Sequence, residues 1–204
     1  MKTLVALMLL GMVLVLPGYC KPTESHLFDL IRSGDYGSMD YALRELPRDY
    51  GTNTEALEFV RNLFDTNETV VCTDPFMQPN RATVRLPVRH DLLIRSLARS
   101  LGDFHATLTT NELSIVYTLF DTRIEDDAMD ALKGLRGMNN PECVPVIIPL
   151  LQNYSAHVAR DAIRTLAVHG DKSVIPKIEP LTKDTRMDVR EDALQAIKEL
   201  QQKP

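Results

Sequence analysis

A phrase that occurs three times constrains the fold of this chain more than any other feature of its sequence. The three copies are IEDDAMDAL (124–132), HVARDAIRTL (157–166) and DVREDALQAI (188–197). At about 100° per residue, the apolar residues of each copy fall on one stripe of a helix, with small Ala residues in the middle. A small residue there lets a neighbouring helix approach closely. Since one amphipathic helix cannot bury its own stripe, the repetition predicts a stack of similar units.

A second phrase lies between the copies of the first, because CVPVIIPL (143–150) matches VIPKIEPL (174–181). Two pairs of prolines align, Pro145 with Pro176 and Pro149 with Pro180. The first proline of each phrase is tolerable in a first helical turn, whereas the second removes a backbone donor and should kink or shorten the helix. The repeated unit is therefore predicted to be helix, turn and helix, with copies 31 to 34 residues apart.

The expected fold class is all-α, an α-solenoid of stacked helical hairpins. We divide the chain into a signal peptide at 1–20, an N-terminal helical region with degenerate repeats at 21–120, and regular repeats at 121–204. Helix-like stretches in the N-terminal region are 38–46, 52–64, 88–103 and 110–121. Between them, β-type runs around a turn with Pro and Asn predict a small irregular or β-hairpin insert at about 66–88.

The C-terminal repeats resemble the HEAT-like repeats of the PBS-lyase type. DVREDALQAIKEL looks like the second helix of such a repeat, with Val189, Arg190, Ala193 and Ile197 at the expected places. SVIPKIEPLTKD looks like the first helix of the same unit. The resemblance covers about residues 121–202, and it implies an α-solenoid whose second helices line a concave surface. HEAT-like repeats also occur in phycobilin lyases, which work inside the cell.

The first 20 residues have the layout of a secretory signal peptide: Lys2, an apolar run of about 13 residues, then small residues. Such a run is too short to span a bilayer comfortably, which takes about 20 apolar residues. Gly18 and Cys20 would lie at −3 and −1 of a cut before Lys21. We therefore expect an exported protein, secreted or periplasmic. The alternatives are an uncleaved anchor and a lipidated Cys20, and either would tether the chain to a membrane.

Two cysteines remain if Cys20 leaves with the signal. Cys72 and Cys143 could then form one disulfide, which would close a loop of about 70 residues. The alternative is two free thiols. It is favoured by Cys143, which aligns with a valine on the apolar stripe of the next unit. Sequons at Asn67 and Asn153 matter only if the host glycosylates its exported proteins.

The net charge of −5 is too small to indicate a nucleic-acid-binding surface or a strongly acidic partner. Five arginines nevertheless crowd into a short stretch: Arg81, Arg85, Arg89, Arg95 and Arg99. They could form a binding patch for acidic protein or lipid head groups. We favour the other interpretation, in which they pair with the acidic run EDDAMD at 125–130.

No motif for a nucleophile, a metal or a cofactor is present: the chain has no G-x-S-x-G, H-E-x-x-H, P-loop or G-x-G-x-x-G. His157 and Asp161 lie four residues apart on a predicted helix, but two ligands do not make a metal site. We therefore expect no catalytic, cofactor-binding or metal-binding residue.

The candidate partner-binding residues lie opposite the apolar stripe of the second helices: Asp126, Asp130, Arg160, Arg164, Glu191 and Gln195. The HEAT-like resemblance implies that these positions face a protein partner. The alternative is a ladder of ion pairs between adjacent units, with Asp126 and Asp130 bonded to Arg160 and Arg164. Such exposed pairs contribute about 0–1 kcal/mol each. The sequence leaves both interpretations open.

Our functional hypothesis is an exported, non-enzymatic α-solenoid scaffold that binds another protein. One alternative is an enzyme or an enzyme subunit, which the resemblance would make lyase-like. Another is a membrane-tethered lipoprotein scaffold. We expect no nucleic-acid partner, and contact with a membrane only if the signal is uncleaved or Cys20 is lipidated.

Overall fold

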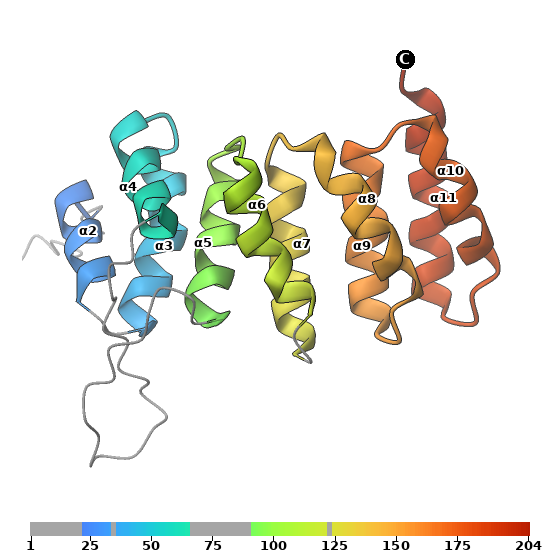
Figure 1. The fold of residues 1–204 in the computed structure, drawn as a ribbon, viewed down its shortest axis with the longest axis horizontal. Coiled ribbons are helices and arrows are strands. Elements are labelled where there is room, and N and C mark those ends of the chain that lie inside the picture. Colours follow the sequence, from blue (N-terminus) through green and yellow to red (C-terminus); the bar gives the residue numbers. More distant parts are fainter. Residues whose placement is uncertain (1–21, 34–35, 66–90, 122–123) are drawn as a thin grey trace, which may run out of the picture.

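The computed structural model describes residues 22–33, 36–65, 91–121 and 124–204 (Figure 1). The described residues form helices and no strand. The α-helices are α2 (Glu24–Arg32), α3 (Tyr36–Tyr50), α4 (Thr54–Asp65), α5 (Asp91–Asp103), α6 (Thr110–Tyr117), α7 (Glu125–Gly137), α8 (Val144–Ile147), α9 (Ala156–His169), α10 (Ile175–Ile178) and α11 (Met187–Gln202). The signal peptide predicted at 1–20 and the insert predicted at 66–88 lie outside the described residues.

The helices form two layers, as the solenoid prediction requires (Figure 1). Helices α3, α5, α7, α9 and α11 pack side by side in one row, and we call them the inner helices. Helices α4, α6, α8 and α10 lie in front of them in Figure 1 and form the outer layer. Each outer helix alternates with an inner helix along the chain. The prediction of an all-α solenoid of stacked helical hairpins is therefore confirmed.

The paired prolines shape the outer layer as expected. Helix α8 ends at Ile147 and continues as a 3₁₀ helix, Ile148–Gln152, which contains Pro149. Helix α10 ends at Ile178 and continues as a second 3₁₀ helix, Glu179–Lys183, which contains Pro180. A proline in a helix interior lacks the N–H donor that the α-helical pattern needs. The second proline of each unit therefore ends the α-helix after a single turn.

The apolar stripe of the repeated phrase forms the core between the layers. Val158, Val189 and Ala193 are buried, as the aligned pattern predicts. Ile124 is the exception, because its side chain is 54% exposed. Helix α7 begins only at Glu125, so Ile124 is the capping residue before the helix and does not share its buried stripe.

Glycines of α5 and α7, which the sequence analysis did not single out, bring these two inner helices into close contact. A Cβ placed on Gly134 would lie 2.4 Å from the carbonyl oxygen of Ala98, and one on Gly102 would lie 2.3 Å from that of Gly134. Cβ atoms do not approach backbone oxygens so closely, so any larger residue would push the two helices apart. Backbone therefore packs directly on backbone at this crossing.

Basic side chains connect the carboxyl ends of neighbouring inner helices. His105 Nδ1 lies 2.9 Å from the carbonyl oxygen of Gly137, and His169 Nε2 lies 2.7 Å from that of Leu135. Lys203 Nζ donates to the carbonyl oxygen of Gly170 over 2.8 Å. The last carbonyls of a helix have no partner within the helix and carry the negative end of its dipole. Each such contact satisfies a carbonyl group and joins two units.

Helix α2, which the sequence analysis did not predict, covers one end of the row. Leu27 and Ile31 are its buried residues. Phe28 stacks on Phe59 of α4, with ring centroids 4.1 Å apart. The helix therefore buries its apolar side against the first hairpin and shields that end of the core from water.

Ala193→Asp tests whether the stack unfolds as a unit. Ala193 is fully buried where α11 packs on α9, and a charge buried without a partner costs several kcal/mol. We expect the thermal midpoint of the whole helical signal to fall strongly. The matched control is Leu194→Asp at the neighbouring position, where the Leu194 side chain is 59% exposed. This substitution should change the free energy of unfolding by less than about 0.5 kcal/mol. An unchanged midpoint in Ala193→Asp would contradict the stacked arrangement.

Candidate partner-binding surface

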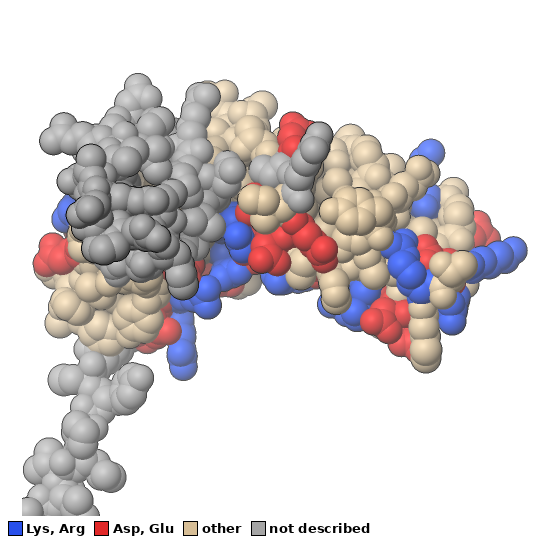
Figure 2. Space-filling model, turned by 90° about the horizontal axis from the view of Figure 1, so that it is seen from below, with Lys and Arg blue, Asp and Glu red and all other residues tan. Residues whose placement is uncertain are grey.

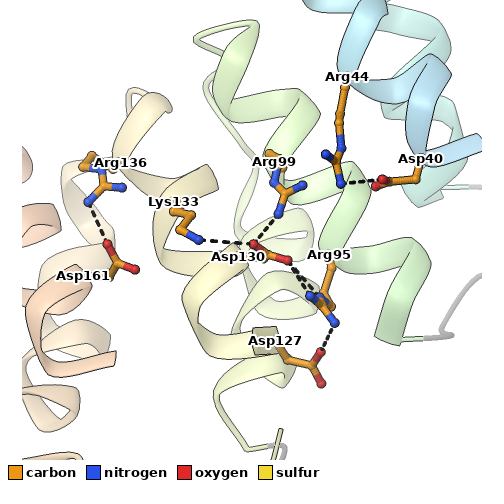
Figure 3. A network of polar contacts seen from close by, with 9 residues as sticks. All are labelled: Asp40, Arg44, Arg95, Arg99, Asp127, Asp130, Lys133, Arg136 and Asp161. Atoms are coloured by element: carbon orange, nitrogen blue, oxygen red, sulfur yellow. Dashed lines mark hydrogen bonds and ion pairs between the residues drawn. The ribbon is translucent and has the colours of Figure 1, made fainter. Parts of the chain in front are cut away.

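Charged side chains gather on the hollowed side of the stack. Figure 2 shows the molecule as an arch, with Lys, Arg, Asp and Glu side chains along its concave edge, which the inner helices form. The contacts between these side chains join successive inner helices, and we call the whole set the inner ladder. Figure 3 shows its central part, on α3, α5, α7 and α9.

The strongest part of the inner ladder lies between α5 and α7. Arg95 donates to Asp130 Oδ2 through Nε over 3.0 Å and through Nη2 over 2.7 Å. Arg99 Nη2 donates to the other oxygen of Asp130, and Lys133 Nζ lies 3.8 Å from it. Arg95 Nη1 also lies 3.2 Å from Asp127 Oδ1. Three cations therefore surround one buried carboxylate, and one of them reaches a second.

Asp127 is the least satisfied group of this network. Its side chain is 1% exposed, and among the described residues neither carboxylate oxygen accepts a hydrogen bond of good geometry. The nearby charge of Arg95 is its compensation. Removing Arg95 would leave a buried carboxylate without a partner, which is strongly destabilising.

The electrostatics of Asp130 follow from these contacts. Burial on its own raises the pKa of this carboxyl group. The hydrogen bonds from Arg95 and Arg99, together with their charges, outweigh burial and lower the pKa below its ordinary value. Asp130 therefore stays ionised at neutral pH.

The inner ladder continues through the regular repeats. Arg136 Nη1 of α7 donates to Asp161 Oδ1 of α9 over 3.2 Å. Asp192 of α11 accepts from Arg160 Nε over 2.8 Å and from Arg164 Nη2 over 3.1 Å. Each step therefore runs from a guanidinium group on one inner helix to a carboxylate on the next.

These contacts correct the ladder expected from the sequence. One of the two open interpretations was a ladder in which Asp126 and Asp130 bond to Arg160 and Arg164, and that pairing is wrong. Asp130 bonds backward to α5, and the two arginines bond forward to α11. At each step the carboxylate comes from the Asp that aligns in the three repeated phrases: Asp127, Asp161 and Asp192. Asp130 is a second carboxylate at the step from α5 to α7. The favoured interpretation of the arginine-rich stretch is confirmed for Arg95 and Arg99, which pair with the acidic run. Arg81, Arg85 and Arg89 lie outside the described residues.

The structure places the six candidate partner-binding residues differently from one another. Asp126, Glu191, Gln195 and Arg164 are exposed. Gln195 Nε2 donates to Glu199 Oε1 over 2.7 Å. Arg160 is half-buried in the ladder, and Asp130 is buried beneath its three cations. The exposed members remain candidates for contact with a partner. Asp130 is buried and would contribute to binding only by positioning the cations that pair with it.

A groove of about 340 Å³ lies between α9 and α11 on this side of the stack. Two arginines of the inner ladder, three apolar residues and three polar residues line it: Arg136, Arg164, Ala167, Val168, Ala196, Asp192, Gln195 and Glu199. Arg136 and Arg164 come from different inner helices and meet at this groove. Arg136 was missed by the sequence analysis, although its place at the end of the first repeated helix could have indicated it.

The remaining candidates for chemistry are structural or lie outside the described residues. Cys143 is a buried free thiol, and burial raises its pKa to about 12, so it stays protonated and unreactive at neutral pH. Cys72 lies outside the described residues, and the disulfide between them stays a prediction. Among the described residues, no three His, Cys, Asp or Glu side chains group as metal ligands. No helix in this part of the chain is long and apolar enough to span a bilayer.

Comparison with known proteins agrees with this architecture. The family model described as HEAT repeats matches residues 125–198. The complex of CpcE and CpcF of phycocyanin lyase from Nostoc sp. PCC7120 contains a similar structure, with a TM-score of 0.62 and 19% identity. The match covers 90% of this chain and 66% of that one, so the chain spans just under two thirds of that relative's length.

An engineered protein of known crystal structure is also similar, with a TM-score of 0.52 and 17% identity over 86% of this chain and 78% of that one. No curated protein sequence matches the chain. At these identities the two structures establish the fold alone. Together with the repeats matched at residues 125–198, they show a solenoid fold of HEAT-like repeats.

The lowered pKa of Asp130 predicts how stability depends on pH. In the unfolded chain this carboxyl group titrates near its ordinary pKa of about 3.9. Its ionised form therefore stabilises the fold fully above about pH 4, and this contribution is lost as the pH falls through the lower folded pKa. Asp184 acts in the same direction, because hydrogen bonds from Arg186 lower its pKa to about 2. We therefore expect the thermal midpoint to fall as the pH is lowered from about pH 4 toward pH 2.

Asp130→Asn should lower the midpoint at pH 7 and make it less sensitive to acid, because one of the responsible carboxylates is gone. The control is Asp126→Asn, an exposed position on the same helix, which should keep the pH profile of the wild type. Thermal melts by circular dichroism over this pH range measure both. Identical profiles for wild type and Asp130→Asn would show that the pair with Arg95 and Arg99 does not stabilise the fold.

Proposed function

We propose that this chain is an exported, non-enzymatic scaffold that binds another protein through the concave side of its HEAT-like stack. The observation that supports it most is the inner ladder. It fixes charged side chains of successive helices in one orientation on the hollowed side, and several of their ends remain exposed. A partner that meets such a surface loses little conformational freedom in ordering it.

Export is supported by the sequence of residues 1–20, with its single lysine, short apolar run and small residues before Lys21. The protein would then act outside the cell or in the periplasm. Sequencing the amino terminus of the mature protein tests this part. A terminus at Lys21 supports a cleaved signal, and a terminus at Met1 contradicts it.

A role without catalysis is supported by the state of the candidate reactive groups. The carboxylates of the inner ladder are held by arginines, and Cys143 is buried and protonated. A general base or nucleophile needs a partner arranged for proton transfer. The ladder uses its carboxylates for pairing between helices.

A second candidate is a subunit of an enzyme. The similar structure from Nostoc is a complex of two proteins of a phycocyanin lyase, so that relative works together with a protein partner. On this proposal too, the present chain would need a partner, and the catalytic groups would belong to the assembly. The two candidates differ in whether the captured complex converts a substrate.

Arg164→Ala tests the binding surface. Arg164 is 46% exposed, and Arg160 still pairs with Asp192 when Arg164 is removed, so stability should change by no more than about 1 kcal/mol. An exposed arginine that anchors an interface contributes about 2 kcal/mol or more to binding. We expect Arg164→Ala to reduce recovery of a cross-linked partner from the exported fraction.

The control is Lys177→Ala, an exposed cation on α10 in the outer layer. It removes the same charge from the other side of the stack and should leave recovery unchanged. Equal loss in both variants, or no partner captured by the wild type, would contradict binding at the concave surface. A loss of stability in Arg164→Ala that matches the loss of binding would assign Arg164 to the fold alone.

A further inference from the structure

The inner ladder is asymmetric in depth, because its carboxylates lie deeper than the cations that pair with them. The side chain of Asp130 is 7% exposed, against 26% for Arg99 and 40% for Lys133. Asp161 is 7% exposed, against 28% for Arg136. Asp192 is 17% exposed, against 46% for Arg164. The acids therefore support the cations from below, and the cations face the solvent.

The same order holds at the first inner helix, where Arg44 is 56% exposed and its partner Asp40 only 18%. Figure 3 shows Arg44, Arg99, Lys133 and Arg136 following one another across α3, α5 and α7. Arg164 continues the series on α9. We call these five residues the cation row. The chain carries a net charge of −5, yet at these positions the most exposed charged groups are cations.

The cation row also has donors to spare. A guanidinium group has five N–H donors. The contact of Arg136 with Asp161 uses Nη1, and the contacts of Arg164 with Asp192 use Nη2. The remaining donors of each fork are those that bind a second carboxylate bidentately in charge-assisted hydrogen bonds.

We propose that the cation row binds an acidic, extended segment of the protein partner, whose Asp or Glu carboxylates each meet one exposed cation. This inference rests on the proposed function and names the chemistry of its partner. The net charge alone was too small to indicate such a partner. The net charge sums all charged groups of the chain, whereas binding depends on which member of each ion pair faces the solvent.

The surroundings of the row favour a protein segment over other anionic partners. A lipid bilayer is flat, and the row lies on the concave side of an arch, where a flat surface cannot reach it (Figure 2). A nucleic acid strand carries one charge about every 3.4 Å, which is much closer than the about 8–10 Å between packed helices. A protein segment can instead carry its carboxylates at the wider spacing of the cations.

The spacing of the helices sets the spacing of the acids. Packed helices lie about 8–10 Å apart, and an extended chain advances about 3.3 Å per residue. Cations on successive inner helices therefore match an acidic residue at about every third position. The row ends at α11, where the order is reversed: Asp188 is 63% exposed and its partner Arg160 25%. This end fits a basic residue, which would give the bound segment a direction.

The test measures binding of the mature chain to a fluorescent (Glu-Ala-Ser)₄ peptide. Arg44→Gln/Lys133→Gln removes two exposed cations, and Lys133 lies 3.8 Å from a carboxylate that two arginines already hold, so the fold should tolerate the change. We expect the peptide to bind the wild type and to bind this variant at least fivefold more weakly. Equal thermal midpoints confirm that the variant is folded.

The matched control is Lys177→Gln/Lys183→Gln, which removes two exposed cations from the outer layer. It should bind the peptide as the wild type does, and a (Lys-Ala-Ser)₄ peptide should bind none of the proteins along the row. An equal loss in both double variants, or no binding to the wild type, overturns the proposal. So does tighter binding to phosphatidylserine vesicles than to the acidic peptide.

The outcomes separate this inference from the proposed function. If a natural partner is captured through Arg164 while the acidic peptide binds the wild type and the Arg44→Gln/Lys133→Gln variant equally, the proposed scaffold function stands. In that case the proposal of an acidic partner segment is wrong. If no partner is captured at all, the proposed function fails, whatever the peptide does.

Discussion

The direct contact of α5 with α7 at Gly102 and Gly134 is the constraint on which the rest of the structure depends. Because backbone meets backbone there, no side chain can lie between the two helices at the crossing. The longer side chains must leave on either flank. On the hollowed flank, Arg95 and Arg99 of one helix come within hydrogen-bonding distance of Asp130 of the next. Close packing therefore produces the inner ladder, and the ladder in turn fixes the register of the helices.

The energetics of the ladder explain which side chains reach the solvent. A buried carboxylate needs a cation nearby, and the short Asp side chain cannot reach past its own helix surface. The long guanidinium side chain can reach over the carboxylate while its outer edge stays in water. The cations therefore face the concave surface at most steps from Arg44 to Arg164. A stabilising feature of the fold thus becomes a surface of defined charge, which supports its use in binding.

The sequence predicted the stacked hairpins and the outer-layer prolines, because both are properties of a single helix and its neighbours along the chain. It could not predict which arginine meets which aspartate. A helical pattern shows that Arg160 and Asp192 lie on polar sides of their helices, but the partner depends on the offset between two helices, which only packing determines. The contact through Gly102 and Gly134 was missed for the same reason. Ile124 was misplaced because the aligned phrase does not show where α7 begins.

The most direct test of this account is a photo-cross-link from one side of the stack to the natural partner. A photoreactive amino acid replaces Gln195, which is exposed on inner helix α11, or Lys177, which is exposed on outer helix α10. Both proteins are exported, irradiated in place and analysed by mass spectrometry. The account predicts one partner protein cross-linked from position 195 and none from position 177. Cross-links from position 177 alone, or from neither position, would contradict it.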